Sequence, residues 1–287
     1  MKIKVWGSRG SIPSPGKDTV KYGGESTCLE LVTQDNKTII IDAGSGLRKL
    51  GQQILKQNNT NEIALMLTHA HWDHLAGFPF FRPAYFSNYK IYLCAGGQPQ
   101  DSLLKYLKHQ MDPPYFPVEF SKLKSKIISG CRCENGNCDH KLCTTGDSIK
   151  CYSIPLNHPN GGYGFKFIEK NKSFVFLTDN EIRYSHPGGL ERKDYVEFSR
   201  NADVLFHDAN YNEKEYEKTI GWGHSTCKDA IDLAIEAGVK RLGLFHHDPD
   251  RSDSDLDEQM EWCENYIKSL RSGLDCFACY EGMVIEI

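Results

Sequence analysis

The chain has 287 residues, of which 39% are hydrophobic and 25% are charged, a composition typical of a soluble globular protein. Its formal net charge of -4 argues against a large basic surface for a nucleic-acid backbone. No apolar run approaches the roughly 18 residues of a membrane span, and the opening MKIKVWGSRG lacks an apolar signal segment. We therefore expect a cytoplasmic protein whose cysteines are thiols or metal ligands.

Short apolar, β-branched runs alternate with amphipathic helical patterns along the chain. Strands are predicted at 2–6, 28–32, 38–44, 63–69, 90–95, 151–156, 163–168, 173–179, 203–208, 241–247 and 283–287. Helices with a 3.6-residue period are predicted at 46–56, 101–110, 227–238 and 255–270. Because no linker or internal repeat interrupts this pattern, we predict one layered α/β domain over residues 1–287, with helices covering the sheets.

Polar residues of metal-binding type stand at the carboxyl ends of several predicted strands. They are Asp42, His69, Asp179, Asp208 and His246. Strand ends can present side chains from a rigid scaffold to a common cleft. A single polar residue at a strand end is ordinary, but five residues that are all His or Asp favour a shared site.

The segment LTHAHWDHLAG, residues 67–77, contains the densest group of such residues. His69 and His71 alternate along the chain, so in extended backbone both point to the same side. Asp73 and His74 fall in the turn that follows, from which they can face the same cavity. Imidazole and carboxylate ligands suit divalent zinc, iron or manganese, so this segment predicts a metal site.

THAHWDH resembles the H-x-H-x-D-H motif of the metallo-β-lactamase superfamily, a four-layer αββα sandwich with a one- or two-metal site. Further matches follow in the family's order, at His158 in PLNHPNGGYGF, Asp179 in VFLTDNE and His246 in LGLFHHDPDR, where His247 is a close rival. The resemblance implies one metal held by His69, His71, His158 and Asp179, and a second held by Asp73, His74, His246 and Asp179. It also implies that Asp42, in IIIDAG, orients a metal-bound imidazole.

The segments WGSRGSIPSPG, ADVLFHDANY and GWGHST resemble the ribonuclease Z and cyclic phosphodiesterase branch of that superfamily. There the histidine of GHST, here His224, is supported by an acid, which is glutamate in ribonuclease Z relatives and Asp208 in this chain. An imidazole held by a carboxylate can protonate a departing alkoxide after attack by a metal-bridging hydroxide. We therefore predict Asp73, His224 and Asp208 as catalytic residues. The alternative is that His224 only belongs to the capping region of the next helix.

The short spacing between two of the implied ligands bears on the substrate. Only residues 159–178 separate His158 from Asp179, which leaves no room for the long arm with which many ribonuclease Z enzymes grip transfer RNA. We therefore predict a small cyclic phosphodiester as substrate, most directly a cyclic nucleotide, with no extended nucleic-acid surface and no membrane partner. The resemblance alone implies a homodimer. The alternatives are a ribonuclease Z-like RNA endonuclease and a metal-loaded sensor or binding scaffold without turnover.

A cysteine-rich segment, GCRCENGNCDHKLC, interrupts the pattern at about residues 128–145 and is interpreted as an insertion. It contains Cys131, Cys133, Cys138 and Cys143. Four thiols this close could bind a structural zinc ion, although their spacing is not that of a standard finger or ribbon. The alternative is a disulfide-forming or merely thiol-rich hairpin.

Overall fold

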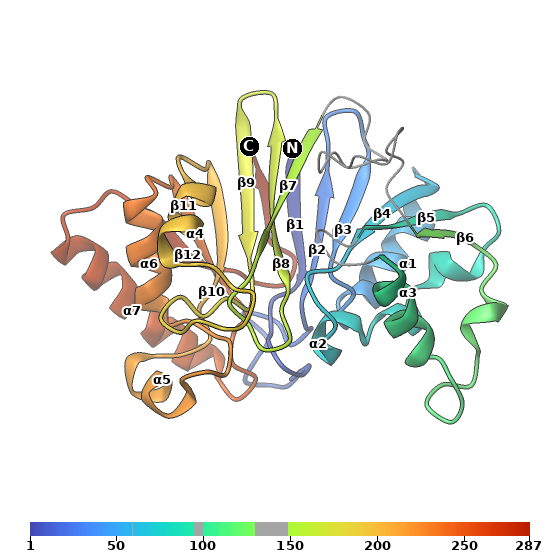
Figure 1. The fold of residues 1–287 in the computed structure, drawn as a ribbon, viewed down its shortest axis with the longest axis horizontal. Helices are drawn as coiled ribbons and strands as arrows, with labels where there is room; N and C mark the ends of the chain where they lie inside the picture. The colour runs from blue at the N-terminus through green and yellow to red at the C-terminus, as the bar shows by residue number, and fades with distance from the viewer. Residues whose placement is uncertain (59, 95–99, 130–148) are drawn as a thin grey trace.

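The computed structural model describes residues 1–58, 60–94, 100–129 and 149–287, and shows two mixed β-sheets lying face to face (Figure 1). The first sheet has the strand order β13–β1–β2–β3–β4–β5–β6. Its strands are β1 (Lys2–Gly7), β2 (Cys28–Val32), β3 (Thr38–Ile41), β4 (Glu62–Met66), β5 (Lys90–Cys94), β6 (Lys126–Ser129) and β13 (Val284–Glu286). Strands β3 to β6 run parallel, whereas β13, β1, β2 and β3 pair antiparallel.

The second sheet has the strand order β12–β11–β10–β9–β8–β7. Its strands are β7 (Ile149–Pro155), β8 (Tyr163–Glu169), β9 (Lys172–Leu177), β10 (Val204–Asp208), β11 (Arg241–Phe245) and β12 (Asp275–Ala278). Strands β9 to β12 run parallel, and β7 to β9 form an antiparallel meander. Glu169 pairs with Lys172, so the hairpin between β8 and β9 has only a two-residue turn.

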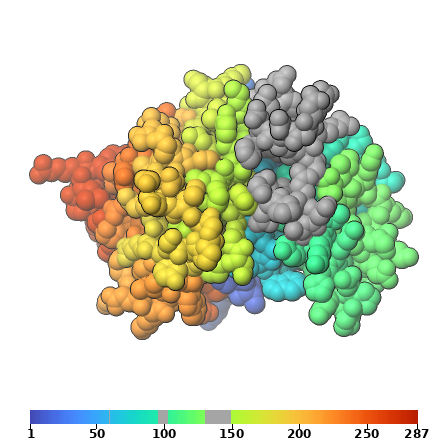
Figure 2. Space-filling view, in the orientation of Figure 1, coloured from blue at the N-terminus to red at the C-terminus, as the bar shows by residue number. Residues whose placement is uncertain are grey.

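Helices cover the outer face of each sheet. On the first sheet lie α1 (Leu47–Gln57) and α3 (Gln100–His109), together with the 3₁₀ turns η1 (Phe78–Phe80), η2 (Arg82–Tyr85) and η3 (Phe120–Lys122). The second sheet is flanked by α4 (Arg192–Ser199), α6 (Cys227–Glu236) and α7 (Asp253–Ser269). The short helices α2 (Trp72–Leu75) and α5 (Glu213–Thr219) belong to the connections that follow β4 and β10. The α3 flank and the α4 and α6 flank are therefore at opposite ends of the molecule (Figure 2).

Three apolar layers hold this sandwich together. Residues such as Leu29, Ile39, Phe174 and Phe206 fill the space between the sheets, and all four are fully buried. Two further clusters join each sheet to its helices. Because the parallel strands are covered on both faces, they are near-continuous apolar runs, such as the fully buried TIII of β3. The predicted four-layer αββα fold is confirmed.

The predicted strands and helices are all present in the described residues, with modest shifts at their ends. The predicted strand 63–69 ends at Met66, so His69 lies in the following loop. The helices α2, α4 and α5 and the strands β6 and β12 lie outside the predicted ranges. The cysteine-rich segment with Cys131, Cys133, Cys138 and Cys143 lies outside the described residues. None of the helices in the described ranges is long and apolar enough to cross a membrane.

Candidate metal centre

The five polar residues predicted at strand ends all lie at or just beyond the carboxyl ends of parallel strands. Asp42 follows β3, His69 follows β4, Asp179 follows β9, Asp208 ends β10 and His246 follows β11. All five are buried. Asp42, Asp179 and His246 have φ values of 63°, 48° and 61°, in a left-handed region that is uncommon for residues other than glycine. Such backbone strain clusters at functional sites.

The structure brings together the first predicted ligand group. His69, His71, His158 and Asp179 each offer one ligand atom, and these atoms lie within 4.8 Å of one another. The Nε2 atom of His158 lies 3.0 Å from Nδ1 of His71. The Nε2 atom of His69 lies 3.6 Å from Oδ2 of Asp179. The four side chains thus converge on one point from three separate loops.

The second predicted group also includes the carboxylate of Asp179. Asp73, His74, Asp179 and His246 also offer ligand atoms within 4.8 Å of one another. The Nε2 atoms of His74 and His246 each lie 3.1 Å from Oδ2 of Asp73 and 3.2 Å from an oxygen of Asp179. Asp179 therefore belongs to both groups. His247 points elsewhere, since its Nε2–H donates to the carbonyl of Cys279 at 2.8 Å.

Both groups fit divalent cations. Burial holds the pKa of His69 well below its usual range and lowers the pKa of His158 to about 4, so both imidazoles are neutral and present lone pairs. The buried Nε2 atom of His69 has no hydrogen-bond partner among the described residues. Burial alone would lower the pKa of His74, but the carboxylates of Asp73, Asp179 and Asp42 raise it well above its usual range. This buried cluster of carboxylates requires positive charge, which bound metal ions would supply.

Asp42 fixes the orientation of His74. The Nδ1–H of His74 donates to Oδ2 of Asp42 at 2.8 Å, which leaves its Nε2 atom facing Asp73 and Asp179. Thr68 donates from both its backbone N–H and its hydroxyl to the same carboxylate. A carboxylate behind an imidazole ligand sets its tautomer and raises its basicity.

We expect the substitution Asp42→Asn to weaken metal binding by about 10- to 100-fold, because His74 loses its anionic partner. Competition with a chromogenic chelator would measure the affinity. Asp203→Asn is the matched control, since Asp203 is also a buried aspartate but pairs with Lys172 and Lys240 at the opposite end of β10. Equal metal affinities for the Asp42 and Asp203 variants would contradict the assigned role.

The predicted pair of His224 and Asp208 lies against the second ligand group. The Nδ1–H of His224 donates to Oδ2 of Asp208 at 2.7 Å, and the rings of His224 and His246 stack with centroids 4.7 Å apart. Burial alone would lower the pKa of His224, but the Asp208 carboxylate raises it to about 9. The cap of α6 is Thr226, whose hydroxyl accepts from the N–H of Asp229. His224 is therefore held by Asp208 and is not the helix cap.

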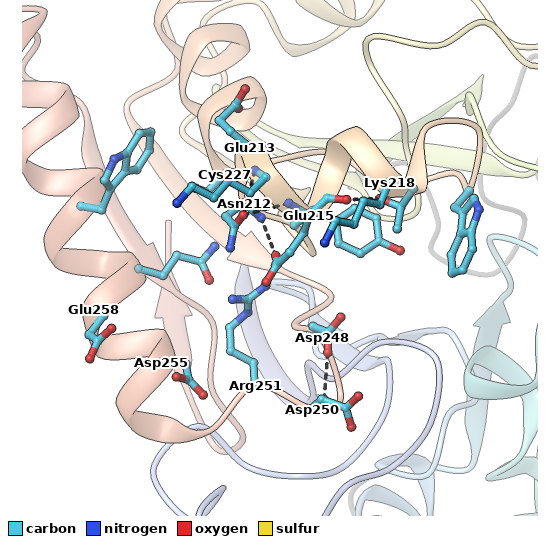
Figure 3. Close-up of a pocket in the computed structure, with 16 residues that line it drawn as sticks. Asn212, Glu213, Glu215, Lys218, Cys227, Asp248, Asp250, Arg251, Asp255 and Glu258 are labelled. Atoms are coloured by element: carbon cyan, nitrogen blue, oxygen red, sulfur yellow. Dashed lines mark hydrogen bonds and ion pairs between the residues drawn. The ribbon is translucent and has the colours of Figure 1, made fainter.

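A groove of about 990 Å³ lies beside this pair, between α5 and α7 (Figure 3). Tyr211 lines the groove, and its ring centroid lies 5.8 Å from that of His224. The lining contains more carboxylates than cationic groups: Glu213, Glu215, Asp248, Asp250, Asp255 and Glu258 against Lys214, Lys218 and Arg251. These carboxylates would repel an anionic phosphate backbone, so we expect the phosphates of a substrate to lie outside the groove, which Trp222 also lines.

Sequence reasoning missed several residues that shape this centre. Ser11 donates from its backbone N–H to Oδ2 of Asp73 at 2.8 Å, and Asn210 donates from its amide to the carbonyl of His246 at 3.0 Å. Ser11 lies in the segment WGSRGSIPSPG, whose family resemblance gives no separate role to this residue. Thr68 is adjacent to the histidine motif, and Glu181 lies two residues beyond Asp179. Proximity to a predicted ligand was the only sequence signal for the last two.

Comparisons with known proteins agree with this geometry. Residues 37–247 match the family described as the β-lactamase superfamily domain. The chain belongs to the metallo-β-lactamase superfamily. It is 25% identical over 296 residues to a ribonuclease Z of Picrophilus torridus, covering 89% of this chain and 88% of the relative. The predicted resemblance to the ribonuclease Z branch is thereby confirmed.

Solved structures of the same fold cover the whole chain. The metallo-β-lactamase fold protein YhfI of Bacillus subtilis is similar with a TM-score of 0.69 and 18% identity, over 100% of this chain and 98% of that protein. The short form of human tRNase Z is similar with a TM-score of 0.63 and 18% identity, over 100% of this chain and 99% of that protein. This family membership and the His/Asp groups support a metal-dependent hydrolase with divalent metals. The comparisons do not support the predicted restriction to small substrates.

Proposed function

We propose that this chain is a metal-dependent phosphodiesterase that cleaves RNA in the manner of ribonuclease Z. The observation that carries this proposal is the position of Asp179, which is shared between two His/Asp groups while the His224–Asp208 pair is stacked on one of them. The comparisons favour RNA over a small cyclic ester, because curated relatives matched along nearly nine-tenths of their length are ribonucleases Z.

The ligand groups, His224 and Asp208 have different roles in the proposed hydrolysis. Divalent ions held by the two groups would lower the pKa of a water molecule toward neutrality and offset charge on the phosphoryl oxygens. His224 carries the proton that the departing oxygen needs, because its imidazolium form is favoured at neutral pH. Asp208 holds the Nδ1 atom of His224, so the Nε2–H remains available to the substrate.

Two exposed tryptophans are close in sequence to residues of the centre. Trp72 lies between His71 and Asp73 in the motif of the first half of the fold, and 64% of its surface is exposed. Trp222 lies two residues before His224 in the second half, and 63% of its surface is exposed. Exposed aromatic rings of this kind stack on nucleobases with little sequence preference. The two exposed rings therefore support the proposal that the substrate carries bases close to the scissile phosphate.

We expect Trp222→Ala to raise KM for an RNA substrate by about tenfold with little change in kcat, because base stacking contributes about 1–3 kcal/mol of binding. Steady-state kinetics would measure both constants. Trp262→Ala is the control, since Trp262 is also partly exposed but stacks on Tyr266 of α7. A tenfold rise in KM for the Trp262 variant alone would locate the RNA elsewhere.

A small cyclic phosphodiester is the second candidate, and the hairpin between β8 and β9 favours it. This hairpin turns in two residues, so the stretch between His158 and Asp179 contains no long arm that could grip a transfer RNA. If RNA is the substrate, it must be held by other surfaces. The homodimer implied by the resemblance also remains a proposal, and light scattering of the purified protein would test it.

The discriminating experiment compares kcat/KM for a precursor transfer RNA with a 3′ extension against 3′,5′- and 2′,3′-cyclic nucleotides. The same metal-loaded preparation is used for every substrate. The proposal predicts cleavage of the RNA with kcat/KM well above that of each cyclic ester. Rapid hydrolysis of a cyclic ester with intact RNA would establish the second candidate instead. If neither is hydrolysed, the scaffold alternative is favoured.

A further inference from the structure

Glu181 is a buried carboxylate that none of the predicted roles uses. It lies two residues beyond Asp179, in the loop after β9, and its side chain is fully buried. Its backbone N–H donates to the carbonyl of Asn157, the residue before His158, at 2.8 Å. Glu181 therefore connects two of the loops that supply the first ligand group.

Four donors converge on this carboxylate. Its Oε1 atom accepts from the hydroxyl of Tyr216 at 2.9 Å and from the N–H of Gly221 at 2.8 Å. Its Oε2 atom accepts from Nε2 of His186 at 2.8 Å and from the N–H of Gly223 at 2.7 Å. Burying a carboxylate costs free energy unless its oxygens accept hydrogen bonds. The four donors satisfy both oxygens, and a buried polar network satisfied in this way holds its members in fixed positions.

The two glycine contacts fix the loop that enters α6. Gly221 and Gly223 have φ values of 86° and 97°, and both direct their N–H groups inward to Glu181. The carbonyl of Gly223 then accepts from Nδ1–H of His158 at 3.0 Å. A Cβ atom on Gly223 would lie 2.0 Å from that same Nδ1 atom, so only glycine permits this approach. His224 is the next residue along the chain.

We propose that Glu181 is a positioning residue that couples the ligand candidate His158 to the His224–Asp208 pair. By accepting from the N–H of Gly223, it fixes the residue whose carbonyl accepts from Nδ1–H of His158, so that the Nε2 atom of His158 faces Asp179. The peptide unit that carries the Gly223 carbonyl leads directly into His224, whose Nδ1 atom lies at hydrogen-bond distance from Asp208. This inference rests on the proposed function for its effect on turnover, but its effect on metal binding is independent of substrate.

Glu181→Gln tests the proposal with little change in size. The amide replaces one accepting oxygen with an NH₂ group that faces two donors, so the loop must shift. We expect metal affinity to fall by about tenfold in chelator competition, since loss of an outer hydrogen bond to a ligand has effects of this order. We also expect kcat to fall by at least tenfold with KM changed far less.

Controls separate positioning from general stability. Glu169→Gln is the matched variant, because Glu169 is equally buried but pairs with the N-terminal amine at 3.1 Å, and it should lower the melting temperature without changing metal affinity. Tyr216→Phe removes one of the four donors while keeping the charge, and should show a smaller loss in the same direction. This variant keeps the test decisive if Glu181→Gln fails to fold.

A double-mutant cycle with His224→Ala completes the test. Because Glu181 acts partly through His224, the combined loss in kcat should be smaller than the product of the separate losses. Unchanged metal affinity in the folded Glu181→Gln and Tyr216→Phe variants, or the same affinity loss in Glu169→Gln, would overturn the proposal. If the wild-type chain cleaves no phosphodiester, the proposed function fails, while the affinity measurements still decide the role of Glu181.

Discussion

Replacing His224 with alanine is expected to lower kcat for RNA cleavage by about 10²- to 10⁴-fold while the metal content stays unchanged. His224 is bonded to Asp208, stacks on His246 and forms a three-residue group with them, but it belongs to neither of the two four-residue ligand groups. Its loss should therefore remove a proton donor without emptying the centre. Single-turnover kinetics on metal-loaded protein, with the metal content of each sample measured, would establish both results.

The leaving group supplies the control for this prediction. A p-nitrophenyl phosphodiester has a departing oxygen that needs no proton, so the His224→Ala variant should hydrolyse it at close to the wild-type rate. Asp208→Asn should also impair cleavage of RNA, and its effect should not multiply with that of His224→Ala because the two residues act as a unit. An equal loss with both leaving groups would contradict the role of proton donor.

Replacing Asp179 with asparagine is expected to have an effect at least as large. Asp179 is the only residue common to both ligand groups, and its carboxylate lies close to four imidazoles. The neutral amide removes a negative charge from both groups together. We expect fewer than two metal ions per chain and a loss in kcat/KM of about a thousandfold or more, since the chemistry supplied by two ions is worth several kcal/mol.

Metal analysis of the Asp179→Asn protein after gel filtration measures this directly, with the Asp203→Asn variant as control. Both substitutions replace a buried carboxylate with an amide, since Asp179 follows β9 and Asp203 precedes β10. Asp203, however, lies at the end of the sheet opposite the centre, where it accepts from the N–H of Ser173. The control should retain full metal content and activity. Two tightly bound ions in the Asp179→Asn protein would show that the metals lie elsewhere.

Much of the fold was predictable because its elements follow strong local rules. The buried strands β3 and β10 contain short apolar runs, III and VLF, and α7 carries a helical period with a Ser252 cap. The short helices α4 and α5 were missed because seven or eight residues with few apolar positions give a weak periodic signal. Their formation depends on caps and tertiary contacts, such as the burial of Tyr216.

The candidate site also contains residues that the sequence predicts and residues that it does not. The predicted ligand groups could be assembled from the sequence because His and Asp at strand ends are rare in combination and resemble a family motif. Glu181, Thr68 and Asn210 could not, because a carboxylate, hydroxyl or amide in a loop has no periodic context. Their partners are distant in sequence, as with the contact between Glu181 and Gly223. Only the folded chain shows that these polar groups converge behind the predicted ligands.

The metal dependence of phosphodiester cleavage is the most direct test of the proposed two-metal phosphodiesterase. Metal-free protein would be titrated with Mn²⁺ or Zn²⁺ while cleavage of a 3′-extended precursor transfer RNA is followed at each step. We predict that cleavage is absent without metal and rises to a plateau at two ions per chain, because two ligand groups share Asp179. Fully loaded protein that leaves the RNA intact, or cleavage that is equally fast without metal, would contradict this prediction.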